Sequence, residues 1–199
     1  MGLFDVLRGQ RAPKRANLDA LFALTTAQPT LQAGMGYEPT NRAGVCFKPV
    51  QAAPFAELLH DLDQLLEVAG KDTGTKVTQS DDDYGFRWVV LEDPDFEDLV
   101  ATAHLVNQTI EERGYSDKLL CSVFGFVDRS AGGDGAPVYF VYSYKRGTFY
   151  PFAPRGDQRR DTALELRLQG GLTHELPLEP ELERWYPVWG VPVAPGPAE

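Results

Sequence analysis

The stretch Tyr84–Phe126, YGFRWVVLEDPDFEDLVATAHLVNQTIEERGYSDKLLCSVFGF, decides the fold, because it contains a strand, a long helix and a second strand in succession. In its first part, Tyr84–Leu91, apolar side chains occupy both faces, which indicates a central strand rather than an edge strand. We expect the helix to begin at Asp93, whose carboxylate would cap the first backbone N–H groups, and to end at Gly114. Leu119–Val127 is predicted to be a second central strand.

Further elements on both sides of this stretch follow from the spacing of apolar residues. The clearest is an amphipathic helix in which Phe55, Leu58 and Leu62 begin one continuous apolar face, and we expect Gly70 to end it. A shorter helix is predicted after Asn17 as its N-cap. The full set comprises helices over residues 17–24, 54–69 and 161–169, and strands over residues 44–50, 75–79 and 138–144.

The order of these elements alternates hairpins with helices, rather than single strands with single helices. This order predicts an α+β fold, with a mainly antiparallel sheet and helices packed on one face. It is similar to the hairpin and helix order of secretion-chaperone-like proteins, which bind other polypeptides. A length of 199 residues favours one domain. We expect residues 1–16 to form a basic, amphipathic N-terminal arm, residues 17–190 a single α+β domain, and residues 191–199 a disordered tail.

The charge of the chain is negative overall but unevenly distributed. The formal net charge is −10. Residues 57–117 carry four Lys or Arg against sixteen Asp or Glu, whereas residues 1–48 carry six against three, and residues 145–167 also carry six against three. Because nucleic-acid binding needs a cationic surface, the overall charge argues against nucleic acid as a partner. The overall charge does not exclude a local binding site for an anion.

Targeting features are missing from the sequence as it stands. It contains no apolar run of about 18 residues, the length that a membrane-spanning helix needs. Met1–Leu7 is too short for the apolar part of a secretory signal, and no cleavage site follows it. We therefore expect a cytoplasmic protein.

The segment Lys145–Arg160, KRGTFYPFAPRGDQRR, is the most unusual in the chain, because cations and aromatic residues are interleaved in it. One interpretation is a binding site for an anionic partner: a lipid head group, a phosphate or an acidic helix. The other is that the cations pair with the acidic middle of the same domain and stack on aromatic rings. The candidate anion- or partner-binding residues are Lys145, Arg146, Phe149, Tyr150, Arg155, Arg159 and Arg160.

The N-terminal arm combines an apolar stripe with cations, which is the composition of a weak anchor on anionic lipid. A frayed terminus, or a segment lying on the surface of the domain, would have the same composition. The candidate membrane-contacting residues are Leu3, Phe4, Leu7, Arg8, Arg11, Lys14 and Arg15.

No pattern in the sequence matches a catalytic or metal-binding constellation. Three adjacent acids at Asp81–Asp83 suit a solvated hairpin turn better than a calcium loop, which needs alternating ligands. Cys46 and Cys121 lie in separate apolar runs, which indicates two buried free thiols, with a disulfide or a redox pair as the alternative. We predict no catalytic residue, no metal site and no cofactor.

Several strings, taken together and in order, carry a family resemblance. They are NLDALFAL, VCFKPV, RWVVLEDPDFEDLVATAHLVNQTIEERGYSDKLLCSVFGF, VYSYKRGTFYPFAP, QRRDTALELRLQGGL and RWYPVWG. From Gly2 to about Gly190 the sequence resembles the PspA-associated protein PspAB family.

The resemblance implies a non-enzymatic accessory or adaptor protein of a phage-shock-type envelope-stress response, with a PspA-like stress protein as its partner. It also implies a link to an HtpX-like membrane protease. One alternative is a peripheral sensor at the inner face of the membrane, which binds anionic lipid through the two basic segments. Another is an uncharacterised enzyme that acts on a small anionic molecule beside the segment Lys145–Arg160.

Overall fold

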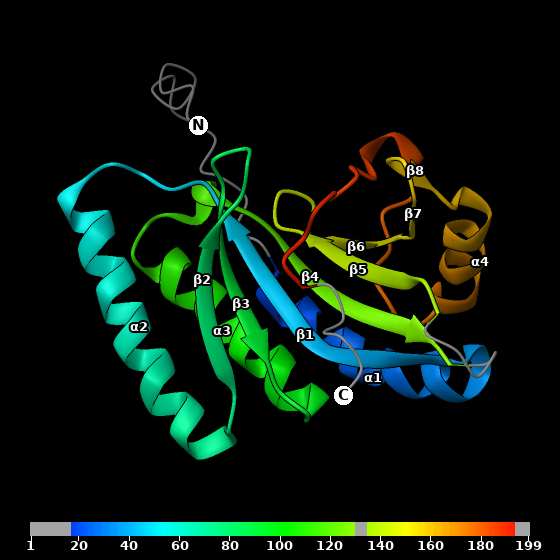
Figure 1. Cartoon of the computed structure of the whole chain (residues 1–199), viewed down its shortest axis with the longest axis horizontal. Coiled ribbons are helices and arrows are strands. Elements are labelled where there is room, and N and C mark those ends of the chain that lie inside the picture. The colour runs from blue at the N-terminus through cyan, green and yellow to red at the C-terminus, as the bar shows by residue number, and fades with distance from the viewer. Residues whose placement is uncertain (1–16, 130–134, 194–199) are drawn as a thin grey trace, which may run out of the picture.

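A six-stranded antiparallel sheet forms the centre of the computed structural model, which describes residues 17–129 and 135–193 (Figure 1). The spatial order of the strands is β2-β3-β1-β4-β5-β6, and each neighbouring pair is antiparallel. The α+β fold expected from the sequence is therefore confirmed. The strands are β1 (Tyr37–Phe47), β2 (Lys76–Asp81), β3 (Arg87–Glu92), β4 (Leu119–Asp128), β5 (Pro137–Ser143) and β6 (Thr148–Phe152). A small hairpin, β7 (Pro154–Arg155) and β8 (Arg159–Arg160), follows β6.

The helices differ from prediction mainly in length. The helix α2 continues past Gly70 through Thr73, and the chain leaves it only at Gly74, whose φ of 87° is the left-handed conformation that glycine adopts easily. Asn17 precedes the first turn without a side-chain cap, so the predicted capping role was wrong. The helices are α1 (Ala23–Pro29), α2 (Ala53–Thr73), α3 (Phe96–Glu112) and α4 (Thr162–Leu172). Single turns occur at η1 (Leu18–Phe22), η2 (Thr30–Gly34), η3 (Ser116–Lys118) and η4 (Leu182–Arg184).

The helix α3 connects two inner strands, β3 and β4, as the sequence predicted, but its cap is not Asp93. The Asp93 side chain is buried and accepts hydrogen bonds from the Thr75 hydroxyl and from the backbone N–H of Asp95, the latter at 2.8 Å. Asp95 is the N-cap, and its Oδ1 accepts from the N–H of Glu97 at 2.8 Å. Two aspartates flank Pro94, and the contact with Thr75 leaves the second of them to cap the helix.

The observed boundaries of two strands, β3 and β1, also differ from the predicted ones. Tyr84 lies in the turn before β3 rather than in the strand, because the Asp82 carboxylate accepts hydrogen bonds from the N–H groups of Tyr84 and Phe86, both at 2.9 Å. The strand β1 begins well before the predicted Gly44 and ends at Phe47. An irregularity in its pairing with β4, together with Asn41 at a φ of 60°, interrupts the alternation that would have revealed it.

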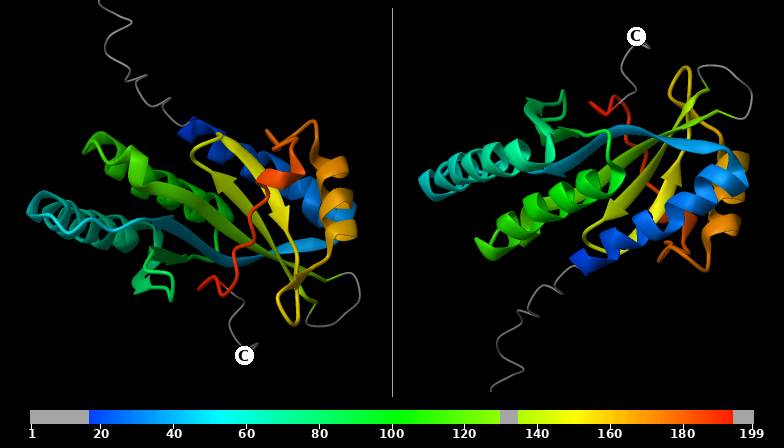
Figure 2. Two further views of the ribbon diagram at one scale, coloured as in Figure 1. Left: turned by 90° about the horizontal axis from the view of Figure 1, so that it is seen from above. Right: turned by 90° about the horizontal axis from the view of Figure 1, so that it is seen from below.

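The two faces of the sheet are covered by different kinds of structure. On one side, which we call the helix face, α1, α2, α3 and α4 bury apolar residues against the strands. On the other side, the strap face, residues 185–193 cross the strands as an extended segment that we call the strap (Figure 2). The helices are thus confined to one face, as expected.

The strap corrects the predicted boundary of the domain at Gly190. Val191 and Val193 are buried on the strap face, and Gly44 lies beneath Val193. A Cβ at Gly44 would lie 2.8 Å from Cγ1 of Val193 and 3.0 Å from Cε3 of Trp88. Only a residue without a side chain lets the strap lie so close to β1. Residues 191–193 therefore belong to the domain, and residues 194–199 lie outside the described part of the chain.

Candidate functional site

The segment Lys145–Arg160 does not form one continuous surface. Its aromatic residues lie in or beside β6 and are buried: Phe149 packs on the helix face, whereas Tyr150 packs on the strap face. Lys145 and Arg146 are exposed in the turn between β5 and β6. The remaining predicted cations lie in the β7–β8 hairpin, beyond the opposite end of β6. The length of that strand therefore separates two groups of cations.

The cations of the β7–β8 hairpin pair with nearby acids. Arg155 forms an ion pair with Asp161, and Arg159 lies 3.7 Å from Asp157. In Asp161 the carboxyl has a lowered pKa, because it accepts a hydrogen bond from Arg155 and another from the backbone N–H of Leu164 at the start of α4. These pairs are local, and none of these acids belongs to the acidic segment 57–117.

Arg160 is the most deeply engaged of these cations. Its Nε lies 2.9 Å from both carboxylate oxygens of Glu165, a residue that is only 1% exposed. Its Nη1 donates to the backbone carbonyl of Trp185 at 2.7 Å, and the guanidinium lies 5.4 Å from the ring centre of Phe152. Arg160 thus joins α4 to the strap and has a structural role.

Lys145 and Arg146 are arranged differently. Within residues 17–129 and 135–193, no ion pair engages either of them. Their turn lies against the start of the described chain, because the Tyr142 hydroxyl donates to the Asn17 carbonyl at 2.7 Å and Gly147 lies beside the Asn17 backbone nitrogen. The predicted N-terminal arm, with Leu3, Phe4, Leu7, Arg8, Arg11, Lys14 and Arg15, lies outside the described residues, and its last position precedes Asn17.

The strap leaves part of its face uncovered, and a pocket of 640 Å³ opens there. We call it the strap pocket. Its floor is the strap face of the sheet, and the side chains that form this floor come from β1, β3, β4 and β6. They are Cys46, Trp88, Cys121 and Tyr150.

The rim of the strap pocket is aromatic and partly charged. Tyr84 and Tyr186 are 68% and 67% exposed, and they come from the β2–β3 turn and from the strap. Asp82 and Lys145 add one charge of each sign. Exposed tyrosines around an apolar floor are typical of protein-binding surfaces. The sequence placed Tyr84 in a central strand, and no local pattern marked Tyr84 and Tyr186 as neighbours of one pocket.

Burial shifts the ionisation of groups near the strap pocket. The pKa of the Cys46 thiol is raised, chiefly by its hydrogen bond with Cys121 and then by burial. Burial also raises the pKa of Tyr150 well above its usual value, and its hydroxyl donates to the Tyr186 carbonyl at 2.9 Å. These groups are neutral at physiological pH, so the floor of the pocket is suited to apolar ligands.

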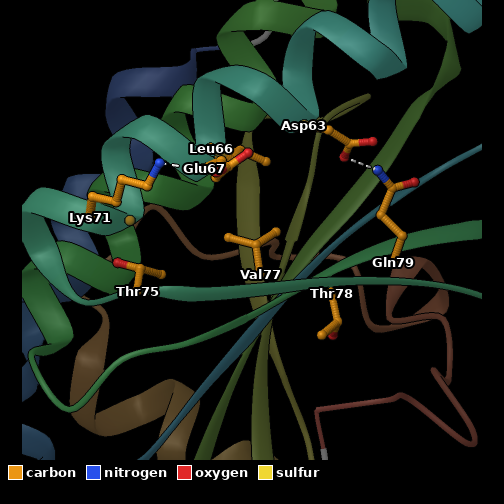
Figure 3. A pocket seen from close by; sticks show the side chains of 9 residues that line it. Asp63, Leu66, Glu67, Lys71, Thr75, Val77, Thr78 and Gln79 are labelled. Atoms are coloured by element: carbon orange, nitrogen blue, oxygen red, sulfur yellow. Dashed lines mark hydrogen bonds and ion pairs between the residues drawn. The ribbon is translucent and has the colours of Figure 1, made fainter.

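A second cavity, of 670 Å³, lies between α2 and the edge strand β2 (Figure 3). Leu66 and Val77 point into it, whereas the polar residues at its edges pair with each other. Gln79 donates to Asp63, and Lys71 lies 3.0 Å from Glu67. Because these polar groups already have partners, the cavity offers less to a ligand than the strap pocket does.

Among the described residues, no three His, Cys, Asp or Glu side chains come together in a way that could hold a metal ion. In the same part of the chain, no helix has the length and apolar character needed to cross a membrane.

Comparison with known proteins gives one match. The family model PspAB, described as PspA associated protein B, covers residues 1–193. Searches of curated proteins and of solved structures gave no match. The family model spans almost all of the 199 residues, including both faces of the sheet, the strap and the strap pocket. The chain belongs to the PspAB family of PspA-associated proteins.

Proposed function

We propose that this protein is a non-enzymatic accessory protein of a PspA-linked, phage-shock-type envelope-stress response, and that it binds a PspA-like protein. The observation that carries the proposal is the family match over residues 1–193, whose description names an association with PspA. In this proposal the protein acts in the cytoplasm as an adaptor, and an HtpX-like membrane protease is a second partner.

The strap pocket is the surface we propose for this partner. PspA-type proteins are helical, and an amphipathic helix presents a row of apolar side chains that suits an apolar groove. Tyr84 and Tyr186, both part of the lining, would contact this row, and Lys145 would meet an acidic residue of the partner. The support is the chemistry of the lining, in which six of fourteen residues are aromatic.

The test is capture of the cognate PspA-like protein by the purified full-length protein at moderate salt. We expect Tyr84→Ala combined with Tyr186→Ala to weaken capture at least tenfold, because exposed aromatic residues carry a large share of interface energy. Val68→Ala, which alters an exposed apolar residue on α2, is the control and should leave capture unchanged. Absence of capture by the wild-type protein would refute the proposal, and equal capture by all variants would refute the assigned surface.

Peripheral binding to an anionic membrane is a second candidate function, and one observation favours it. The turn with Lys145 and Arg146 lies against Asn17, where the basic N-terminal segment joins the domain. Cations of the two segments would then act on the same patch of lipid, at about 1 kcal/mol for each cation near the surface.

Co-sedimentation with vesicles of phosphatidylglycerol and phosphatidylcholine tests this second function. Lys145→Ala with Arg146→Ala should reduce binding several-fold, and Arg155→Ala with Arg159→Ala is the control of equal charge change. Equal losses in both variants would show a general charge effect without a site at the turn, and wild-type protein that stays in the supernatant would exclude lipid binding.

A further inference from the structure

The two cysteines of the chain, far apart in sequence, are direct neighbours in the sheet. Cys46 on β1 and Cys121 on β4 are partners in the antiparallel register, and both are free thiols. Directly opposed residues of an antiparallel pair have Cα atoms about 4.5–5.5 Å apart. Disulfides form across Cα separations of about 4.4–6.8 Å, so this pair can be bridged without moving the strands.

Both thiols face the strap pocket. Cys46 belongs to the apolar cluster of the strap face, and Cys121 packs against that cluster. Cys46 is 3% exposed, whereas Cys121 is partly exposed, and both line the pocket. A small molecule in the pocket therefore reaches Cys121 more readily, and Cys46 lies beside it on the neighbouring strand.

We propose that Cys46 and Cys121 form a peroxide-sensitive site, in which hydrogen peroxide converts the two thiols into a cross-strand disulfide at the floor of the strap pocket. This site goes beyond the proposed binding of a PspA-like partner and does not depend on it. Partly exposed cysteines beside a second cysteine are the usual sites of reversible oxidation in proteins.

The reaction balances in two steps. The Cys121 sulfur, as its thiolate, attacks one oxygen of hydrogen peroxide; the O–O bond breaks, and Cys121 becomes a sulfenic acid while hydroxide leaves and is protonated to water. The Cys46 sulfur then attacks the Cys121 sulfur, the S–O bond breaks, and the leaving hydroxide takes the Cys46 proton to form a second water. The sum is two thiols and one peroxide giving one disulfide and two waters, with sulfur oxidised and peroxide oxygen reduced.

The environment of Cys46 argues against its attacking peroxide in the first step. Its hydrogen bond with Cys121 and its burial raise the pKa of the Cys46 thiol, so this group stays protonated, whereas the thiolate is the species that attacks. Cys46 gives up its proton only in the second step, to the hydroxide that leaves the neighbouring Cys121 sulfenic acid. The division of roles assigns Cys121 as the attacking sulfur and Cys46 as the resolving sulfur.

The test exposes the folded full-length protein to hydrogen peroxide, then labels the remaining thiols in denaturant and measures the intact mass. We expect the wild-type monomer to lose two hydrogens and both labelling sites, and to regain both after reduction. In Cys46→Ser, oxidation should stop at a sulfenic acid on Cys121 that a dimedone reagent traps. In Cys121→Ser, Cys46 should keep its thiol at the same dose.

Three results would overturn the proposal: two thiols that persist in the wild-type protein, a disulfide that joins two chains instead of one, or equal oxidation in both single variants. Circular dichroism establishes that each serine variant is folded. Where a serine variant is unfolded, Cys46→Ala or Cys121→Ala replaces it, and the same three criteria apply.

Discussion

The helix face and the strap face share the same six strands but differ in how tightly they are closed. On the helix face, side chains such as Phe124 and Leu99 are fully buried between strands and helices. On the strap face, nine residues with prolines at 187 and 192 replace the helices, and a pocket of 640 Å³ opens beside them. Proline disrupts the interior of a helix and lacks the N–H group that a strand donates to its neighbour, so this segment covers the sheet without forming a helix or a strand. The helix face is therefore closed by packed side chains, while the strap face leaves a pocket that opens onto the sheet.

The largest expected effect comes from a matched pair of phenylalanines. Phe124 on the helix face and Phe152 on the strap face are both fully buried. Phe124→Ala should lower the free energy of unfolding by about 3–5 kcal/mol, whereas Phe152→Ala should cost less, because the strap can shift into the space left behind. Urea denaturation of both variants measures the difference. Equal costs would mean that the strap is as rigid as the helices.

The ion pair that fastens the strap should give the next largest effect. Glu165→Gln removes the counter-ion of Arg160 and places an amide N–H₂ against donors, including the Ala153 N–H at 2.9 Å. We expect a loss of about 1.5–3 kcal/mol in the free energy of unfolding. Glu67→Gln breaks the exposed pair with Lys71 and serves as the control, with an expected cost of about 0.3–0.5 kcal/mol. Comparable losses in the two variants would contradict a fastening role for Glu165.

Adding one methyl group at Gly44 tests how closely the strap must approach β1. In Gly44→Ala the new Cβ would lie 2.8 Å from Val193 and force the strap or Trp88 to move. We expect the free energy of unfolding to fall by about 1–3 kcal/mol, which is typical of overpacking. Amide hydrogen exchange should become faster in the strap alone. Exchange that rises equally in α3 would show that the two faces open together.

The smallest expected effect appears only at high pH. Burial raises the pKa of Tyr139 on the strap face to about 12, and that of Tyr142 on the helix face also to about 12. Because an unfolded tyrosine ionises near pH 10, both groups stabilise the fold fully below about pH 10, and this contribution is lost as the pH rises toward 12.

Tyr139→Phe should therefore flatten the alkaline decline in the free energy of unfolding while leaving stability at neutral pH nearly unchanged. Tyr142→Phe should flatten it too, but it should also lower stability at neutral pH, since the Tyr142 hydroxyl donates to the Asn17 carbonyl at 2.7 Å. Denaturant titrations at several pH values measure both effects. An unaltered alkaline slope in both variants would show that other groups are responsible for the decline.

The sequence predicted those parts of the fold that depend on local pattern. The apolar periodicity of α2 and α3 and the branched residues of β3 and β4 were sufficient to place these elements, and the family resemblance is confirmed. The predictions were wrong where a contact between residues far apart in the sequence determines the local structure. Asp93 and Asp95 both suit a cap, and Thr75, 18 residues before Asp93, determines which one is used.

The candidate site was harder to predict for the same reason. The segment Lys145–Arg160 is continuous in sequence, but β6 buries its aromatic residues and separates its cations. Conversely, the strap pocket takes its lining from strands, a turn and the strap, and no local pattern links Cys46 to Cys121. Their pairing follows from the register of β1 and β4, which is set by the whole sheet.

The contact of Val193 with Gly44 also has a consequence for the order of events during synthesis. It joins Gly44 to a residue that the ribosome adds 149 positions later. The strands and α3 are complete long before the strap emerges, so a nascent chain exposes Trp88, Tyr150 and Phe152 to solvent until then. Contacts between such distant residues form slowly, and exposed aromatic surface favours aggregation in the meantime. A chain interrupted before residue 185 would keep that surface open and become a natural substrate for chaperones.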